Sequence, residues 1–250
     1  MSSGTTPASS GSSRLGNVLS GVAVALGCLL FLGGFAWGAV TYQPYSVPTD
    51  SMKPAVDPGD RLLAQRIDGS DVHRGDVVVF TDPQWGNASL VKRVVGVGGD
   101  KIACCDAQGR LTVNGTPVAE PYLEERGPSS GTAFSVTVPE GSLFMLGDNR
   151  SVSEDSRIHL TDAAHGAVPV GAVSARVDAR IWPLGRIGGI ARPSSFAALP
   201  GGVSAPGPLT PIAAAVVAGA VLVLGGAAHG PIAARRARRR ARQRVPAEVS

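Results

Sequence analysis

The chain has 250 residues, enough for one or two domains, and its formal net charge of +4 is unevenly distributed. Between Thr41 and Thr210, fifteen lysines and arginines stand against eighteen acidic residues, so this stretch carries about −3. The basic balance comes instead from seven arginines between 235 and 244, directly after an apolar run. Such a run is more typical of a cytoplasmic membrane flank than of a nucleic-acid arm, so the partner expected is a lipid bilayer and not nucleic acid.

Two apolar runs predict membrane-spanning helices. The first 14 residues are rich in Ser, Gly and Thr and are predicted to be disordered. The next 26 residues, 15–40, carry no charge, and about 20 helical residues suffice to cross a ~30 Å hydrocarbon layer. A cleaved secretory signal is the alternative, but its apolar core is usually only about 7–15 residues long, so an uncleaved anchor is favoured. A second uncharged run, richer in Ala and Gly, predicts another span at 209–228.

The arginine-rich tail predicts the orientation of both spans. By the positive-inside rule, the basic residues of 229–250 place the C-terminal end of the second span in the cytoplasm. Two crossings then return both termini to the cytoplasm and leave residues 41–208 outside. The sequence therefore predicts a multi-pass membrane protein with an extracytoplasmic domain.

The stretch between the two apolar runs predicts a mainly β domain over 41–184. Its apolar runs are four to eight residues long, rich in β-branched side chains and separated by turn residues. No sustained 3.6-residue period is present there. A Gly- and Pro-rich stretch, 185–208, is predicted to be a linker to the second span. The predicted strands are Arg61–Gln65, Asp76–Phe80, Leu90–Val95, Arg110–Val113 before an Asn-Gly turn, Phe134–Val138, Ser142–Leu146 and Ala175–Trp182.

The cysteines and histidines do not indicate a metal site. Cys104 and Cys105 are adjacent, so a disulfide between them closes a strained ring, and free thiols or bonds to another chain remain open. Neither these cysteines nor the four histidines have metal-ligand spacing. We therefore expect no metal and no other cofactor.

One of the three lysines has the surroundings of a general base. A serine hydroxyl needs a base within hydrogen-bond reach, and a lysine can act only when it is neutral. Burial among apolar atoms lowers a lysine pKa from about 10.4 toward the working pH. Lys92 lies in a predicted strand between Val91 and Val94, whereas Lys53 and Lys101 lack apolar neighbours. Taken alone, Lys92 would more often be a surface lysine whose aliphatic stem packs on apolar neighbours.

Four segments follow the first apolar run in this order: Val47-Pro-Thr-Asp-Ser-Met-Lys-Pro54, Gly59-Asp60, Lys92-Arg-Val-Val-Gly-Val-Gly-Gly-Asp100 and Gly147-Asp-Asn-Arg-Ser-Val-Ser-Glu-Asp-Ser-Arg157. Together they resemble the sequence boxes of the type I signal peptidases, membrane-bound proteases with a Ser/Lys dyad. The last segment matches the family pattern G-D-N-R-x-x-S-x-D-S-R at every specified position.

The resemblance implies a role for each residue of the site. Ser51 corresponds to the nucleophile and Lys92 to its base, while the Thr49 hydroxyl and the Ser51 backbone N–H correspond to the oxyanion donors. Ser153 is expected to hydrogen-bond the lysine amine, and Asp155 and Arg157 to form an ion pair that fixes the loop. The resemblance implies the signal-peptidase-like β-domain fold and no cofactor.

Apolar residues around the dyad are expected to line shallow substrate pockets. Small pockets suit the Ala-x-Ala residues that precede a signal-peptide cleavage site. Met52 could instead be ordinary core packing. Two departures from the family pattern, Pro54-Ala55-Val56 and Gly98 in place of proline, bear on pocket shape and loop rigidity. The expected pocket residues are Val47, Pro48, Met52, Val56 and Val91.

The leading hypothesis is a serine endopeptidase that removes signal peptides from exported preproteins at a bacterial plasma membrane. A self-cleaving repressor also uses a serine and a lysine, but it needs a DNA-binding segment and no membrane spans. A membrane-tethered β domain that only binds a partner is the alternative from another class. It differs in predicting that replacement of Ser51 leaves function intact.

Overall fold

The computed structural model describes residues 11–123 and 127–243, and side chains within 16–123 and 127–228. The chain divides into two compact units, Met1–Val40 with Pro208–Ser250, and Thr41–Gly207. The predicted disorder of residues 1–10 and the end of the arginine-rich tail, 244–250, lie outside the described residues. The described helix begins at Gly11, four residues before the predicted span.

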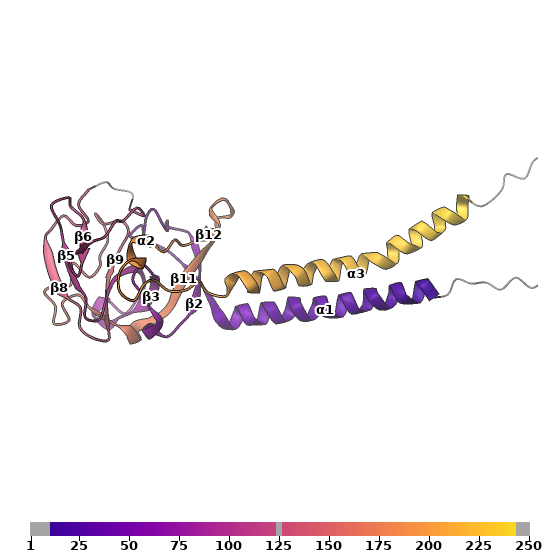
Figure 1. Cartoon of the computed structure of the whole chain (residues 1–250), viewed down its shortest axis with the longest axis horizontal. Coiled ribbons are helices and arrows are strands. Elements are labelled where there is room, and N and C mark those ends of the chain that lie inside the picture. The colour runs from indigo at the N-terminus through magenta and orange to yellow at the C-terminus, as the bar shows by residue number, and fades with distance from the viewer. Residues whose placement is uncertain (1–10, 124–126, 244–250) are drawn as a thin grey trace, which may run out of the picture. The chain divides into compact units, whose positions relative to one another are not determined.

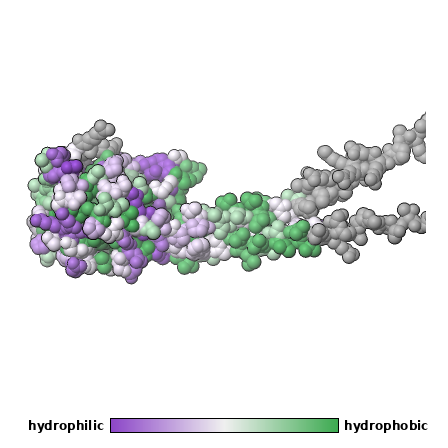
Figure 2. Space-filling view, viewed as in Figure 1, coloured by the Kyte–Doolittle hydropathy of each residue, from purple (hydrophilic) through white to green (hydrophobic). Residues whose placement is uncertain are grey.

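The first unit is a pair of long helices, α1 (Gly11–Thr41) and α3 (Leu209–Gln243), which run side by side in Figure 1. Segments Gly16–Thr41 and Leu209–Ala228 are long and apolar enough to cross a membrane, and Figure 2 shows their apolar surface. Small residues bring the helices close together: a Cβ on Gly27 would lie 2.9 Å from the Gly219 carbonyl oxygen. The helix pair thus matches the two predicted spans.

The second unit contains a large antiparallel sheet. Its strand order is β1-β2-β11-β3-β4-β9-β10, with β12 paired to β11. Every pairing in it is antiparallel. The strands are β1 (Tyr42–Ser46), β2 (Arg61–Arg66), β3 (Val77–Thr81), β4 (Ser89–Val97), β9 (Ser142–Leu146), β10 (Val168–Pro169), β11 (Val173–Trp182) and β12 (Gly188–Gly189).

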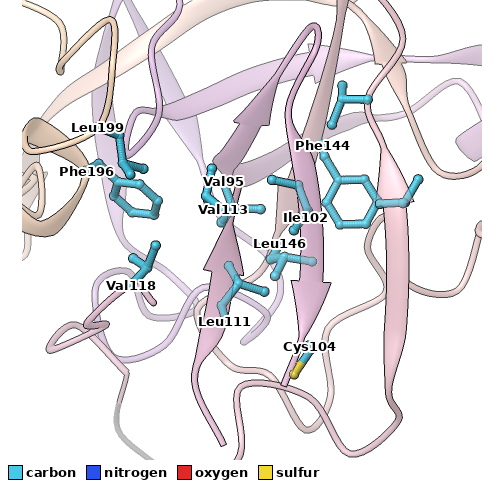
Figure 3. Packing of buried hydrophobic residues seen from close by; sticks show 12 residues of the cluster. Val95, Ile102, Cys104, Leu111, Val113, Val118, Phe144, Leu146, Phe196 and Leu199 are labelled. Carbon is cyan, nitrogen blue, oxygen red and sulfur yellow. The ribbon is translucent and has the colours of Figure 1, made fainter. Parts of the chain in front are cut away.

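A smaller sheet of four strands, in the order β7-β6-β5-β8, completes the β domain. Apolar side chains from both sheets form one buried cluster, part of which Figure 3 shows around Ile102, Phe144 and Leu146. The strands of this sheet are β5 (Lys101–Cys104), β6 (Leu111–Val113), β7 (Thr116–Pro117) and β8 (Phe134–Thr137). Cys104 and Cys105 form a disulfide, which was one of the states left open by the sequence.

The predicted mainly β domain is confirmed. Each predicted strand has a counterpart whose ends agree within two residues: β2, β3, β4, β6, β8, β9 and β11. The Asn-Gly turn after β6 is also present, with Asn114 and Gly115 at φ 54° and 79°. Strands β1, β5, β7, β10 and β12 were not predicted.

The stretch predicted as a linker, 185–208, packs against the β domain instead. The short helix η4 (Leu184–Arg186) lies at its beginning, and the short helix α2 (Ser194–Ala197) lies within it. Phe196 is fully buried and, with Leu199, joins the core cluster (Figure 3). The Ser204 hydroxyl donates a hydrogen bond to Asp76. The linker prediction depended on the Gly and Pro content of the stretch. The few side chains that anchor it to the domain are too widely spaced to change that pattern. The remaining short helices of the domain are η1 (Gly69–Asp71), η2 (Pro83–Trp85) and η3 (Val170–Ala172).

The hairpin between β11 and β12 exposes large apolar side chains. Leu184 is 71% exposed and Ile187 58%, and Trp182 at the end of β11 is 50% exposed. Figure 2 shows apolar surface over this hairpin. Exposed apolar residues gathered in one place are typical of a surface that contacts another molecule or a membrane.

Candidate active site

Ser51 lies in a tight turn between β1 and β2. The base of this connection is closed by hydrogen bonds from the Val47 N–H to the Asp60 carbonyl (3.1 Å) and from the Gly59 N–H to the Val47 carbonyl (2.8 Å). Met52, the next residue, is fully buried, whereas the Ser51 side chain is partly exposed. The turn therefore anchors its apolar residue in the core and presents the neighbouring hydroxyl at the surface.

Lys92 lies in the middle of β4, next to the Ser51 hydroxyl. It pairs with Val78 of β3, and it is only 3% exposed. Its Nζ lies 2.9 Å from the Ser51 Oγ, within hydrogen-bond distance. Residues 41 positions apart in the sequence thus form the contact that a serine nucleophile and a lysine base require.

The surroundings of Lys92 favour its neutral form. Burial lowers the pKa of Lys92 below the usual lysine value, and the positive charge of Arg157 acts in the same direction. The carboxylates of Asp155, Glu154 and Asp148 oppose this shift, but burial outweighs them. A lysine with a lowered pKa is neutral in a larger fraction of molecules near neutral pH, as a general base must be.

Thr49 lies beside the same hydroxyl. Its Oγ1 is 3.2 Å from the Ser51 Oγ, and either oxygen can be the donor. An acyl group bonded to Ser51 would bring its carbonyl oxygen close to this hydroxyl. The position suits a donor for the charge that develops on that oxygen.

Ser153 does not form the expected hydrogen bond to Lys92. Its Oγ is buried and has no hydrogen-bond partner among the described residues. Ser153 is nevertheless close to the dyad, because a Cβ built on Gly147 would lie 2.1 Å from the Ser153 Oγ and 2.5 Å from the Ser51 carbonyl oxygen. Ser153 thus lies near the dyad, as the resemblance implied, but its hydroxyl forms no hydrogen bond to the lysine amine.

Asp155 and Arg157 form the ion pair that the resemblance implied. The contact is bidentate, with Arg157 Nε and Nη2 at 2.8 and 2.7 Å from the two carboxylate oxygens. Asp155 also accepts a hydrogen bond from the Gly147 N–H at 3.0 Å. The pair therefore ties the beginning of the 147–157 loop to its end.

Three of the five predicted pocket residues belong to the core. Met52 and Val56 are fully buried, and Val47 is only 4% exposed. All three pack with core residues of β2, β3 and β11, because the turn that presents Ser51 directs its apolar neighbours inward. Pro48 is exposed and Val91 is half-buried, so these two predicted residues remain accessible at the surface.

The described histidine side chains are engaged elsewhere. His159 lies 2.7 Å from an Asp162 carboxylate oxygen and stacks on Trp85. His73 and His165 contact the backbone carbonyls of Asp71 and Leu160. Lys92 is therefore the titratable base in contact with Ser51 among the described side chains.

Sequence reasoning missed a buried polar network behind the 147–157 loop. Arg93 forms a bidentate ion pair with Asp148, at 2.8 and 2.7 Å. Arg150 pairs with Glu120, 30 residues earlier in the chain. Nothing in the sequence near Glu120 indicates its partner, because the contact depends on how the two sheets are placed together.

Comparisons with known proteins identify the family of this chain. A sequence profile described as "Signal peptidase, peptidase S26" matches residues 18–182. A probable signal peptidase I of Mycobacterium leprae is 32% identical over 206 residues, covering 59% of this chain and 71% of that protein. The signal peptidase I of Mycobacterium tuberculosis is 33% identical over 198 residues, covering 58% and 67%.

A solved structure of a signal peptidase I from Enterococcus faecalis is also similar in sequence. It is 28% identical, covers 42% of this chain and 94% of that one, and superposes with a TM-score of 0.34. The profile match extends over more than half of the chain, from the first span to the end of β11. The chain therefore belongs to the peptidase S26 family of signal peptidases, as a serine endopeptidase of the signal peptidase I type.

Proposed function

We propose that this protein cleaves signal peptides from exported preproteins after Ala-x-Ala, with Ser51 as nucleophile and Lys92 as general base. The observation that carries the proposal is the 2.9 Å contact between the Ser51 hydroxyl and a buried lysine amine. The lowered pKa of Lys92 supports the same roles, because only the neutral amine can accept the serine proton.

The reaction would proceed through an acyl-enzyme. Ser51 Oγ attacks the carbonyl carbon that precedes the cut, while Lys92 takes the hydroxyl proton. The Thr49 hydroxyl and the Ser51 backbone N–H stabilise the negative charge on the carbonyl oxygen. Lys92 then gives its proton to the leaving amine. In the second half, Lys92 takes a proton from a water molecule that attacks the ester carbonyl, the bond to Ser51 Oγ breaks, and Lys92 returns the proton to Ser51, which releases the cleaved signal peptide with a free carboxyl end.

The supporting residues hold this arrangement in place. Asp155 and Arg157 fix the loop that adjoins Lys92, and Ser153 of the same loop places a buried hydroxyl near the dyad, without a hydrogen-bond partner among the described residues. Pro48 and Val91 are the accessible apolar residues beside the dyad and would contact the small side chains before the cut. A shallow apolar surface of this kind favours alanine over larger residues because it has little depth to fill.

A membrane location follows from the two candidate spans and from the family. We assign both termini to the cytoplasmic side and residues 41–208 to the outer side of a bacterial plasma membrane, because the arginine-rich tail follows the second span. The signal peptide of a preprotein lies in the same bilayer, so membrane anchoring brings enzyme and substrate together.

Thiol labelling tests this orientation. A cysteine introduced at the exposed Glu140, in a Cys28→Ser background, is expected to react with an impermeant maleimide added to intact cells. A cysteine introduced at Ser250 is expected to react only after the membrane is opened. Labelling of position 250 in intact cells would contradict the proposed orientation.

The decisive experiment for the proposed function is cleavage of a preprotein by the full chain in detergent micelles. We expect one cut, located by mass spectrometry after the second alanine of Ala-x-Ala. A matched preprotein with leucine at both alanine positions should be cleaved at least about 10²-fold more slowly, since each misfit in an apolar pocket changes the rate about 10- to 200-fold. Equal cleavage of both substrates would refute the proposed specificity.

A further inference from the structure

Glu120 is a buried carboxylate for which the proposed chemistry has no role. It lies in the loop after β7, and its side chain is only 4% exposed. Burying a carboxylate is costly unless it is paired and hydrogen-bonded. Its position in the chain, remote from every catalytic segment, gives no reason for this burial, so the reason must lie in what it contacts.

The carboxylate of Glu120 is fully surrounded by donors. Arg150 contacts both of its oxygens, the Ser129 hydroxyl donates to Oε2 at 2.6 Å, and the Tyr122 hydroxyl donates to Oε1 at 2.5 Å. Burial alone would raise the pKa of Glu120, but the charge of Arg150 and these hydrogen bonds outweigh it and lower the pKa. Glu120 is therefore the anionic centre of the cluster.

Arg150 connects Glu120 to the loop beside the nucleophile. Its Nε donates to the Gly147 carbonyl at 3.0 Å, and its backbone carbonyl accepts from Arg157 at 2.9 Å. The neighbouring Asn149 N–H donates to the Ser51 carbonyl at 3.0 Å. The Arg150 side chain thus fixes the 147–150 turn, and this turn is hydrogen-bonded to the turn that carries Ser51.

Tyr122 connects Glu120 to the strand that carries Lys92. The guanidinium carbon of Arg93 lies 4.2 Å from the centre of the Tyr122 ring, and Arg93 follows Lys92 in β4. Burial and the nearby Glu120 charge raise the pKa of Tyr122 well above its usual value, so the phenol stays protonated and can donate to Glu120. One carboxylate thus contacts partners that lead to both members of the dyad.

We propose that Glu120 is a positioning residue that holds the 147–150 turn and the Lys92 strand in register, so that Ser51 and Lys92 stay in contact. The proposal rests on the proposed Ser51–Lys92 mechanism. The four charged residues that act on Lys92 all lie within 148–157. A looser turn would therefore change the surroundings of Lys92 as well as its distance from Ser51.

The test compares the full-length parent with Glu120→Gln in micelles, using the Ala-x-Ala preprotein. Glutamine keeps the size of the side chain but removes its charge. It also places an NH₂ donor next to groups that are themselves donors, so the NH₂ group cannot replace the acceptor that they need. We expect kcat to fall about 10- to 100-fold, the range caused by small misplacements of reacting groups, with KM little changed. A loosened turn should also let water reach Lys92 and raise its pKa. The acidic limb of the pH profile should then move to higher pH.

Two further variants separate positioning from stability. Asp100→Asn removes the carboxylate from another buried ion pair, with Arg74, whose side chains are 3% and 8% exposed. This variant should lower the melting temperature about as much as Glu120→Gln does, but it should leave kcat and the pH profile unchanged. Glu120→Asp keeps the charge and should recover part of the lost kcat. All rates are normalised to the folded fraction from circular dichroism.

The outcomes distinguish failure of this inference from failure of the proposed function. A parental kcat and pH profile in folded Glu120→Gln would overturn the positioning role. Equal losses of kcat in Glu120→Gln and Asp100→Asn would overturn it too, since a general loss of stability would then explain both. Cleavage that persists in Lys92→Met would refute the dyad itself.

Discussion

Replacement of Lys92 with methionine is expected to lower kcat for preprotein cleavage about 10³- to 10⁴-fold, the upper range for loss of a general base. Methionine has a similar length and apolar character, so it fills the buried position without leaving a cavity. The parent should become active as pH rises through the Lys92 pKa, at a pH below the usual lysine value, because burial lowers that pKa. Steady-state rates between pH 6 and about 11 measure both effects.

The stability of Lys92→Met provides the control. Between the lowered folded pKa and the unfolded value of about 10.4, the unfolded parent binds more protons than the folded protein. The free energy of unfolding of the parent should therefore fall as pH decreases through this window. Methionine does not titrate, so the variant should lack this slope and be at least as stable at neutral pH. An inactive variant that is also unfolded would leave no support for Lys92 as the base.

Substitution of Gly147 with alanine is expected to lower kcat about 10²-fold, as a displacement of about 1 Å at a reacting group can do. The added Cβ would lie 2.1 Å from the Ser153 Oγ and 2.5 Å from the Ser51 carbonyl oxygen, far inside van der Waals contact. Ser153 can rotate away, but the Ser51 carbonyl belongs to the backbone of the nucleophile turn. The turn must therefore move, and Ser51 moves with it. Steady-state kinetics with the Ala-x-Ala preprotein measure the loss.

Gly171→Ala is the matched control for this substitution. Gly171 is exposed, and a Cβ built on it has no atom within 4 Å. This variant should retain the parental kcat and melting temperature. If Gly147→Ala were as active as Gly171→Ala, the close approach of Gly147 to the nucleophile turn would have no functional importance.

The sequence predicted the longer elements of the fold because their signals are local. Strand β3 is a continuous run of β-branched and apolar residues, β4 contains several of them, and both spans are uncharged over at least 20 residues. The shorter strands escaped prediction because their signals are weak. Strands β10 and β12 have two residues each, and the pairing of β1 with β2 depends on a partner that lies beyond the Ser51 turn.

The sequence by itself indicated the family resemblance, the proposed reacting pair and the two candidate spans, because each depends on residue types within short segments. Only the tertiary structure decided that Lys92 is buried 2.9 Å from Ser51, and that Met52 and Val56 are core residues. It also decided that Phe196 anchors the supposed linker and that Glu120 pairs with Arg150. These contacts join segments far apart in the chain, and burial, distance and charge pairing between such segments arise only when the chain folds.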